Sequence, residues 1–222
     1  MQAVPWFWRG RQTLQAGLDE QQTRYEALRR GESAMALLMA EHEPVITLGL
    51  HGLATNVRRP SAELARAHVD VVRLQRGGDV TYHGPGQLMI YPVIRVRSLR
   101  HVIDGIGDAL AGELRKVGID ARWQCKPAGV WVGARKIAAC GMHVRHGIIN
   151  HGFALNVVDD PEPWQWIVAC GTGAPTTSIV GELAADTGNV PTDVASWAER
   201  LGAPLVEACA PWVSYGPRIN PP

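Results

Sequence analysis

Residues 129–144 have the sequence GVWVGARKIAACGMHV, in which two apolar runs flank the pair Gly133-Ala134. Valine, isoleucine and tryptophan favour strands, and a glycine-containing pair between two such runs is typical of a tight hairpin turn. The pattern predicts strands over residues 130–132 and 136–144. Because the two strands of a hairpin pair antiparallel, a sheet that contains them is not strictly parallel.

On either side of this hairpin, hydrophobic spacing predicts further helices and strands. The helices are expected over residues 11–30, 60–68, 101–117 and 192–208, and the strands over residues 34–40, 44–48, 71–75, 88–96 and 148–157. Strands outnumber helices, so the prediction is an α/β fold of the α+β type, with helices packed on a mixed central sheet. The sequence has neither an internal repeat nor a linker rich in Pro, Gly or Ser, so residues 1–222 are expected to form one domain.

Composition argues against several classes of protein. The 222 residues include 22 Lys and Arg and 21 Asp and Glu, and this net charge of +1 argues against a nucleic-acid binder that works through bulk charge. The longest apolar runs, such as residues 34–40, fall far short of the roughly 20 residues that a membrane helix needs. The first residues show no signal-peptide pattern, and the four cysteines form no CxxC pair, so we expect reduced thiols in a cytoplasmic protein.

The most unusual segment is RGGDVTYHGPGQ, at residues 76–87, which contains four glycines. Glycines let the backbone approach a ligand closely, and Thr81, Tyr82 and His83 add hydrogen-bonding side chains. The segment matches neither the phosphate-binding GxxxxGK(S/T) pattern nor the dinucleotide-binding GxGxxG pattern. A ligand-binding loop is favoured, and the alternative is a long connection between two strands.

Lys136 is one of only three lysines in the chain, and it lies inside an apolar strand. A buried charge there is costly unless one face of the strand lines a cleft, so Lys136 is a candidate functional residue. Cys140, His143 and His146 follow it and have the side chains of metal ligands. The odd spacing of Cys140 and His143 places them on opposite faces of a strand, however, so we expect no metal site.

Cys170 is the candidate nucleophile among the four cysteines. It lies in the small-residue segment ACGTG, which predicts a thiol in an open loop. Cys125 and Cys209 lie in contexts where cysteines are usually inert core residues. On a regular strand Cys140 would share a face with Lys136, but at a distance of about 13 Å, which is too far for an ion pair. The sequence has no GxSxG motif, so no serine nucleophile is expected.

Four motifs, in this order, resemble those of the lipoyl(octanoyl) transferases, which are octanoyl-acyl-carrier-protein:protein N-octanoyltransferases. The motifs are RGGDVTYHGPGQ, ARKIAACGMHV, HGFALNV and ACG followed by TTS, and with EHEPVITLG ahead of them the resemblance covers residues 20–183. It implies the catalytic fold that these enzymes share with biotin and lipoate protein ligases. It also implies an acyltransferase of lipoate biosynthesis and protein lipoylation that uses no cofactor.

The resemblance implies a role for individual residues. The nucleophile that forms the acyl-enzyme falls on Cys170, and its lysine partner falls on Lys136. The residues implied to contact the substrate are Arg76, Gly77, Gly78, Asp79, Val80, Thr81, Tyr82, His83, Ala139, Cys140, Gly141, Gly152, Phe153 and Ala154. Backbone N–H groups around Cys170, Gly171 or Gly141 are candidate donors to the oxyanion, and the sequence does not distinguish among them. The implied donor is octanoyl-acyl carrier protein, and the implied acceptors are the lipoyl domains of 2-oxoacid dehydrogenase E2 subunits and the glycine cleavage H protein.

Three positions depart from the family pattern. Ala169 replaces the usual proline before the nucleophile, Cys140 stands where an aliphatic residue is common, and Leu50-His51 follows TLG in place of arginine. None of these changes removes a catalytic group.

Three other functions remain as alternatives. An ATP-dependent lipoate or biotin ligase of the same fold would need no nucleophilic cysteine, a non-catalytic member would need neither Cys170 nor Lys136, and a thioesterase would resolve the acyl-enzyme with water.

Overall fold

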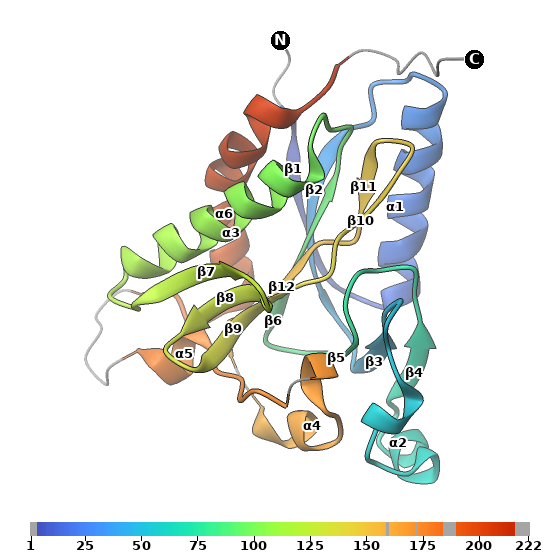
Figure 1. The fold of residues 1–222 in the computed structure, drawn as a ribbon, viewed down its shortest axis with the longest axis vertical. Coiled ribbons are helices and arrows are strands. Elements are labelled where there is room, and N and C mark those ends of the chain that lie inside the picture. The colour runs from blue at the N-terminus through green and yellow to red at the C-terminus, as the bar shows by residue number, and fades with distance from the viewer. Residues whose placement is uncertain (1–3, 159, 172, 184–189, 216–222) are drawn as a thin grey trace.

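The computed structural model describes residues 4–158, 160–171, 173–183 and 190–215, with the exception of the Cys170 side chain (Figure 1). The strands are β1 Trp6–Gln12, β2 Ala36–His42, β3 Val45–Leu48, β4 Asp70–Arg73, β5 Val80–His83, β6 Gln87–Val93, β7 Ala121–Cys125, β8 Ala128–Val132, β9 Arg135–Cys140, β10 His143–Arg145, β11 Ile148–Asn150 and β12 Phe153–Asn156. The α-helices are α1 Leu14–Arg29, α2 Ser61–Arg66, α3 Leu99–Arg115, α4 Pro161–Gln165, α5 Ile179–Glu182 and α6 Val194–Cys209. Short 3₁₀ helices are η1 Ala54–Asn56, η2 Ala169–Gly171 and η3 Ala210–Trp212.

The central sheet has seven strands in the order β1-β2-β6-β12-β9-β8-β7. β1 and β2 run parallel, and every other neighbouring pair in this sheet is antiparallel. The sheet is therefore mixed, which confirms the predicted fold class. The predicted hairpin is β8–β9, and Gly133 in its turn has a φ of 56°, in the left-handed region that favours glycine.

Helices cover both faces of the central sheet (Figure 1). On one face, Ile106 and Leu110 of α3 join Leu201 and Leu205 of α6 in the main hydrophobic core. On the opposite face, α1 contributes Tyr25 to a second core with residues of β2 and β6. The layers are thus α3 and α6, then the sheet, then α1.

A second sheet of three strands, β4-β3-β5, lies at one end of the central sheet (Figure 1). Its own hydrophobic core contains Ile46 of β3, Val80 of β5 and Leu64 of α2. The same core contains Ile167 and Ala169. Because Ala169 is the first residue of η2, this core fixes the backbone on which Cys170 lies beside the glycine-rich segment.

Helix α3 forms where the sequence predicts it, and the local reasons are clear. The side chain of Ser98 caps its first turn. Val102, Ile106 and Leu110 recur every four residues, so they lie on one face of the helix, and all three are fully buried. After the helix, Gly118 adopts a φ of 86°, the left-handed conformation that commonly follows a helix C-terminus.

The predicted helices and most predicted strands are confirmed, with ends shifted by a few residues. The predictions of two long, continuous strands were wrong. The prediction over residues 136–144 joins β9 to β10, although β9 ends at Cys140, and the prediction over 148–157 joins β11 to β12. The second break falls at His151, which has a φ of 58°, and at Gly152, where a Cβ would overlap the carbonyl oxygen of Ile90. The sequence analysis also missed β1, β5 and β7.

Within the described parts of the chain, no helix has the length and the apolar character needed to span a membrane.

Candidate active site

An apolar cavity of about 330 Å³ lies between the central sheet and the glycine-rich segment. Ala139, Ala154 and Met89 stand in register across β9, β12 and β6, and all three line it. The two alanines leave the space above the sheet open, because their side chains end at Cβ. The volume is at the lower end of the range of about 300–1,000 Å³ for small-molecule sites.

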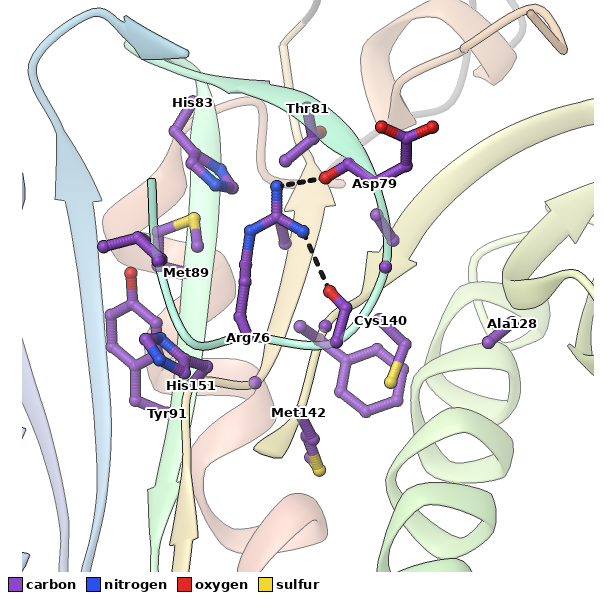
Figure 2. Close-up of a pocket in the computed structure, with 18 of the residues that line it drawn as sticks. Arg76, Asp79, Thr81, His83, Met89, Tyr91, Ala128, Cys140, Met142 and His151 are labelled. Atoms are coloured by element: carbon purple, nitrogen blue, oxygen red, sulfur yellow. Dashed lines mark hydrogen bonds between the residues drawn. The ribbon is translucent and has the colours of Figure 1, made fainter. Parts of the chain in front are cut away.

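The structure brings together thirteen of the fourteen residues implied to contact the substrate, because thirteen line this cavity (Figure 2). They come from three segments that are distant in sequence: 76–83, 139–141 and 152–154. The exception is Tyr82, whose ring packs edge-on against Trp164 and Trp166 at centroid distances of 5.9 and 6.2 Å. Alternate side chains of a strand point to opposite faces, so Tyr82 points away from the side of β5 on which Thr81 and His83 line the cavity.

Lys136 lies on β9, lines this cavity and is only 6% exposed. Its Nζ lies 4.9 Å from the centroid of the Trp131 ring, within reach of a cation–π interaction. The side chain passes over Gly129, where a Cβ would approach Lys136 Cε to 3.1 Å. The missing side chain at Gly129 therefore makes room for the lysine.

A bulge in β9 determines which side chains join Lys136 at the cavity. Val130 pairs with Ala138 and Trp131 pairs with Lys136, so Ile137 is an extra residue on β9. Ile137 and Ala138 both pack in the main core, whereas Ala139 lines the cavity together with Lys136. On a regular strand Ala139 would face the opposite side from Lys136, so the bulge builds this part of the site.

A narrow recess of about 10 Å³ extends from the cavity at Lys136. Lys136, Ala139 and Ala154 line both the cavity and the recess, whereas Ala169 lines the recess and not the cavity. The backbone of Cys170 follows Ala169 in η2. The predicted position of the Cys170 side chain against Lys136 lies outside the described part of the chain.

Backbone hydrogen bonds hold the segment after Cys170 against β9. The Lys136 N–H donates to Pro175 O at 2.9 Å, and the Thr177 N–H donates to Lys136 O at 3.0 Å. Thr177 O also accepts from Asn156 Nδ2 at 2.9 Å, and Asn156 Oδ1 accepts from Gln87 Nε2 at 2.9 Å. β6, β12 and β9 are thereby tied to the chain that leads away from Cys170.

Arg76 and Asp79 organise the glycine-rich segment from within. The Arg76 guanidinium is buried and donates to Thr47 Oγ1, Thr47 O, Gly77 O and Asp79 O. Figure 2 shows the bond to Asp79 O. The Asp79 carboxylate accepts from the N–H groups of Leu53 and Val80 and from Asn56 Nδ2. Both residues therefore line the cavity while their polar groups bind the protein itself.

Gly171 packs directly against this organised segment. A Cβ at Gly171 would overlap the Asp79 carboxylate, and Gly171 has a φ of 67°. Glycine is therefore required for both steric and conformational reasons at the position after Cys170.

The cavity wall includes polar groups that are neutral at pH 7. Burial lowers the pKa of His83 to about 3, with the Arg76 charge as a further cause. His83 Nε2 lies 3.1 Å from Thr47 Oγ1, and its Nδ1 lies 2.6 Å from Gln87 Oε1. Burial also raises the pKa of Tyr91. Among the described residues, no three His, Cys, Asp or Glu side chains are grouped so that they could hold a metal ion.

Cys140 lines the cavity but is unsuited to nucleophilic attack. Burial raises the pKa of its thiol to about 12, and the Lys136 charge only partly opposes this effect. The thiolate, rather than the thiol, is the nucleophilic form of cysteine. Cys140 is therefore a wall residue in the neutral thiol form.

Two of the expected oxyanion donors already have partners. The Gly141 N–H donates to Gly152 O at 2.8 Å, and the Gly171 N–H donates to Val168 O at 3.1 Å. In this conformation neither is available to an oxyanion.

The sequence analysis missed several residues of the site. Tyr91 and His151 line the cavity, and Gln87 and Asn156 line the recess. His151 and Asn156 lie within HGFALNV, and Gln87 ends RGGDVTYHGPGQ. Their place within these motifs was the signal that could have identified His151, Asn156 and Gln87 as site residues.

Comparison with known proteins finds similarity to a lipoyl protein ligase family model and to octanoyltransferases. The family model "Lipoyl protein ligase A/B catalytic domain" matches residues 15–201. The octanoyltransferase of Solibacter usitatus is 40% identical over 174 residues, covering 77% of this chain and 79% of that protein. The octanoyltransferase of Dictyoglomus turgidum is 42% identical, covering 66% of this chain and 63% of that protein, so the match spans less than two thirds of its length.

Solved structures show the same fold at low sequence identity. A bi-partite lipoate protein ligase from Thermoplasma acidophilum gives a TM-score of 0.64 at 17% identity, covering 95% of this chain and 83% of that one. A lipoate-protein ligase A bound with ATP gives a TM-score of 0.60 at 18% identity, covering 95% and 85%. The predicted likeness to the lipoate ligase fold is confirmed. From the family match and the relatives at about 40% identity, it follows that the chain belongs to the lipoyl protein ligase A/B catalytic-domain family, in which its sequence is similar to those of the octanoyltransferases.

Proposed function

We propose that this protein transfers an octanoyl or lipoyl group from acyl carrier protein to a lysine amine of lipoyl domains, through an acyl-enzyme on Cys170. The main supporting observation is the place of Lys136. It is buried where the apolar cavity meets the recess that Ala169 lines, and Ala169 directly precedes Cys170. The similarity to curated octanoyltransferases supports the same reaction.

The cavity suits a medium-length acyl chain. Its floor is formed by Ala139, Ala154 and Met89, and the polar groups of Arg76 in its wall are directed to protein acceptors. Sheltering the seven carbons beyond an octanoyl carbonyl from water contributes about 5–6 kcal/mol, at about 0.8 kcal/mol per methylene. The carbonyl end would then lie at Lys136, where the cavity joins the recess.

The reaction divides one difficult aminolysis into two acyl transfers. In the first, the Cys170 thiolate attacks the thioester carbonyl of the donor, the bond from carbon to the carrier sulfur breaks, and Lys136 gives a proton to the departing thiolate. In the second, the acceptor amine attacks the acyl-enzyme, the bond from carbon to Cys170 sulfur breaks, and Lys136 takes the proton that the amine loses. Each cycle restores the ammonium and the thiolate, and neither step consumes ATP.

The acceptors are lipoyl-domain proteins, as the lipoate ligase and octanoyltransferase relatives imply. In finer detail, the proposed acceptors are the E2 subunits of 2-oxoacid dehydrogenases and the glycine cleavage H protein, and the proposed donor is octanoyl-acyl carrier protein. We also propose a cytoplasmic location and one catalytic domain over residues 1–222, because the cysteine spacing suits reduced thiols and the sequence contains no linker.

Incubation with octanoyl-carrier protein and an apo lipoyl domain, without ATP, tests this function. Intact mass spectrometry should show one octanoyl group added to the lipoyl domain. A product that appears only with ATP and free octanoate would instead identify a ligase. Release of octanoate with an unmodified lipoyl domain would identify a thioesterase.

A further inference from the structure

The chain that leads into Cys170 is held by a short segment that includes Asn56. Val57 and Ile167 form an isolated antiparallel bridge. Next to this bridge, the Val168 N–H donates to Asn56 O at 2.7 Å. The backbone of Asn56 is therefore bound to the chain two residues before Cys170.

The side chain of Asn56 reaches the chain after Cys170 through a carboxylate. Asn56 Nδ2 donates to Asp79 Oδ2 at 2.8 Å. Asp79 packs in turn against Gly171, because the three atoms nearest to a Cβ built at Gly171 are all atoms of Asp79. Asn56 is therefore linked to the chain on both sides of Cys170, directly before it and by way of one carboxylate after it.

The Asp79 carboxylate is held in one orientation. Its Oδ1 accepts from the N–H groups of Val80 and Leu53, at 2.7 and 3.2 Å. Figure 2 shows the carboxylate pointing away from Arg76, which binds the backbone carbonyl of Asp79 at 2.7 Å. Oδ1 is thus bound by the backbone, and Oδ2 is the oxygen that meets the Asn56 amide. A hydrogen bond to a carboxylate is stronger than one between neutral groups, so this donor is well suited to fix a loop.

Asn56 lies outside the spaces proposed to hold the acyl group. Among the described residues, those that line the cavity and the recess do not include Asn56. It is half-buried at the end of η1, and it is not part of the hydrophobic core of the three-stranded sheet. The contacts of Asn56 therefore affect where Cys170 lies, rather than how the acyl group is bound or how the core packs.

We propose that Asn56 is a positioning residue that holds Cys170 at the recess beside Lys136. Its backbone acts through Val168, and its side chain acts through Asp79. The inference rests on the proposed acyl transfer and adds the residue that keeps the nucleophile in place. Without the Asn56 amide, the Asp79 carboxylate turns more freely and the loop moves relative to Lys136. A small movement is enough, because a displacement of about 1 Å at a reacting atom can lower a rate by about 100-fold.

Exchange of the two side chains tests the proposal. In Asn56→Asp, a second carboxylate faces Asp79 in place of the donor, and the two like charges should drive the side chains apart. In Asp79→Asn, Oδ1 can still accept from the backbone, and rotation of the Asn56 amide can restore the side-chain hydrogen bond. In the double variant, the amide at position 79 can donate to the carboxylate at position 56. The pair is then restored with the same net charge as in wild type.

Single-turnover acylation by octanoyl-carrier protein gives a maximal rate and a half-saturating concentration for each variant, and thermal melts confirm that each is folded. In Asn56→Asp the maximal rate should fall by about 10- to 100-fold. The half-saturating concentration should not change, because Asn56 lies outside the acyl cavity. The double variant should recover most of the rate, and Thr55→Ala, an exposed neighbour in η1, should match wild type. A wild-type rate in folded Asn56→Asp, or a loss that the folded double variant does not recover, would overturn the proposal.

Iodoacetamide labelling of Cys170 across pH keeps this test separate from the reaction. Asn56→Ala removes the donor without adding a charge, so its labelling profile should move to higher pH as Cys170 moves away from the Lys136 charge. If wild type transfers no octanoyl group but the profile moves in Asn56→Ala and not in Thr55→Ala, the proposed function fails and the role of Asn56 stands. If wild type transfers octanoyl and neither the rate nor the profile changes in the folded Asn56 variants, the function stands and the role of Asn56 fails.

Discussion

Replacement of Lys136 by methionine removes one buried positive charge and nearly preserves side-chain length. An ammonium about 4 Å from a thiolate stabilises it by roughly 4 kcal/mol at an effective dielectric constant near 20. At about 1.4 kcal/mol per pKa unit, this corresponds to up to about three units. An adjacent positive charge favours the charged thiolate, so removing it should raise the pKa of Cys170 and slow acylation at pH 7 by about 100-fold or more.

The fold should tolerate the change. Lys136 is only 6% exposed, and its Nζ lies 4.9 Å from the Trp131 ring centroid. Methionine loses the cation–π interaction, worth about 1–2 kcal/mol, but it also avoids the cost of burying a charge. The free energy of unfolding should therefore change by less than about 2 kcal/mol.

Iodoacetamide labelling across pH provides the measurement, with peptide mass spectrometry to follow Cys170 separately from the other cysteines. Lys116→Met is the control, because Lys116 is an exposed lysine that pairs with Glu113 at the end of α3. The Lys136→Met profile should move to higher pH, and the control profile should match wild type. If Lys136→Met is folded and its profile is unchanged, Lys136 is not the partner of the thiolate.

Three further predictions follow from the site. Octanoyl-carrier protein without acceptor should leave one hydroxylamine-sensitive octanoyl group, which Cys170→Ala should lose and Cys140→Ala should keep; recovery of the adduct on Cys140 would contradict the mechanism. In Gly171→Ala, the new Cβ should overlap the Asp79 carboxylate and strain a backbone φ of 67°, at a cost of about 1–3 kcal/mol. The rate of octanoyl transfer should therefore fall by at least about tenfold, while the far-UV circular dichroism spectrum stays native. Normal turnover would show that this loop tolerates displacement. Burial lowers the pKa of His83 to about 3, so as pH falls the unfolded chain binds a proton at this histidine before the native protein does. The stability that neutral His83 contributes is therefore complete above about pH 6.5 and is lost as pH falls toward 3. In urea unfolding, the free energy of unfolding of folded His83→Gln should vary with pH by a few kcal/mol less than that of wild type.

Regular elements could be predicted from the sequence because their signals are local. The fourfold spacing of Val102, Ile106 and Leu110 specifies the buried face of α3 without reference to the rest of the chain. The turn at Gly133-Ala134 likewise specifies the β8–β9 hairpin. β1 and β7 were missed because Arg and Gln interrupt their apolar patterns, and both strands lie at the edges of the sheet, where one side lacks a strand partner.

The site residues could be predicted as motifs, but their orientations could not. RGGDVTYHGPGQ suggests one continuous ligand loop, whereas Val80–His83 is a strand. That strand turns Tyr82 toward Trp164 and Trp166 and leaves Thr81 and His83 on the cavity side. Strand alternation was the information that the motif alone lacked.

The site lies where strand periodicity breaks down. The bulge at Ile137 brings Ala139 to the same cavity as Lys136, and the break at His151-Gly152 interrupts the strand where His151 lines that cavity. Each irregularity depends on a neighbour in another strand, such as Val130 for the bulge and the Ile90 carbonyl for Gly152, so it leaves little trace in the local sequence. A regular β9 and an unbroken strand over 148–157 would direct these side chains elsewhere. The departures from regular pairing are thus what bring Lys136, Ala139 and His151 into the lining of one cavity on a mixed sheet with helices on both faces.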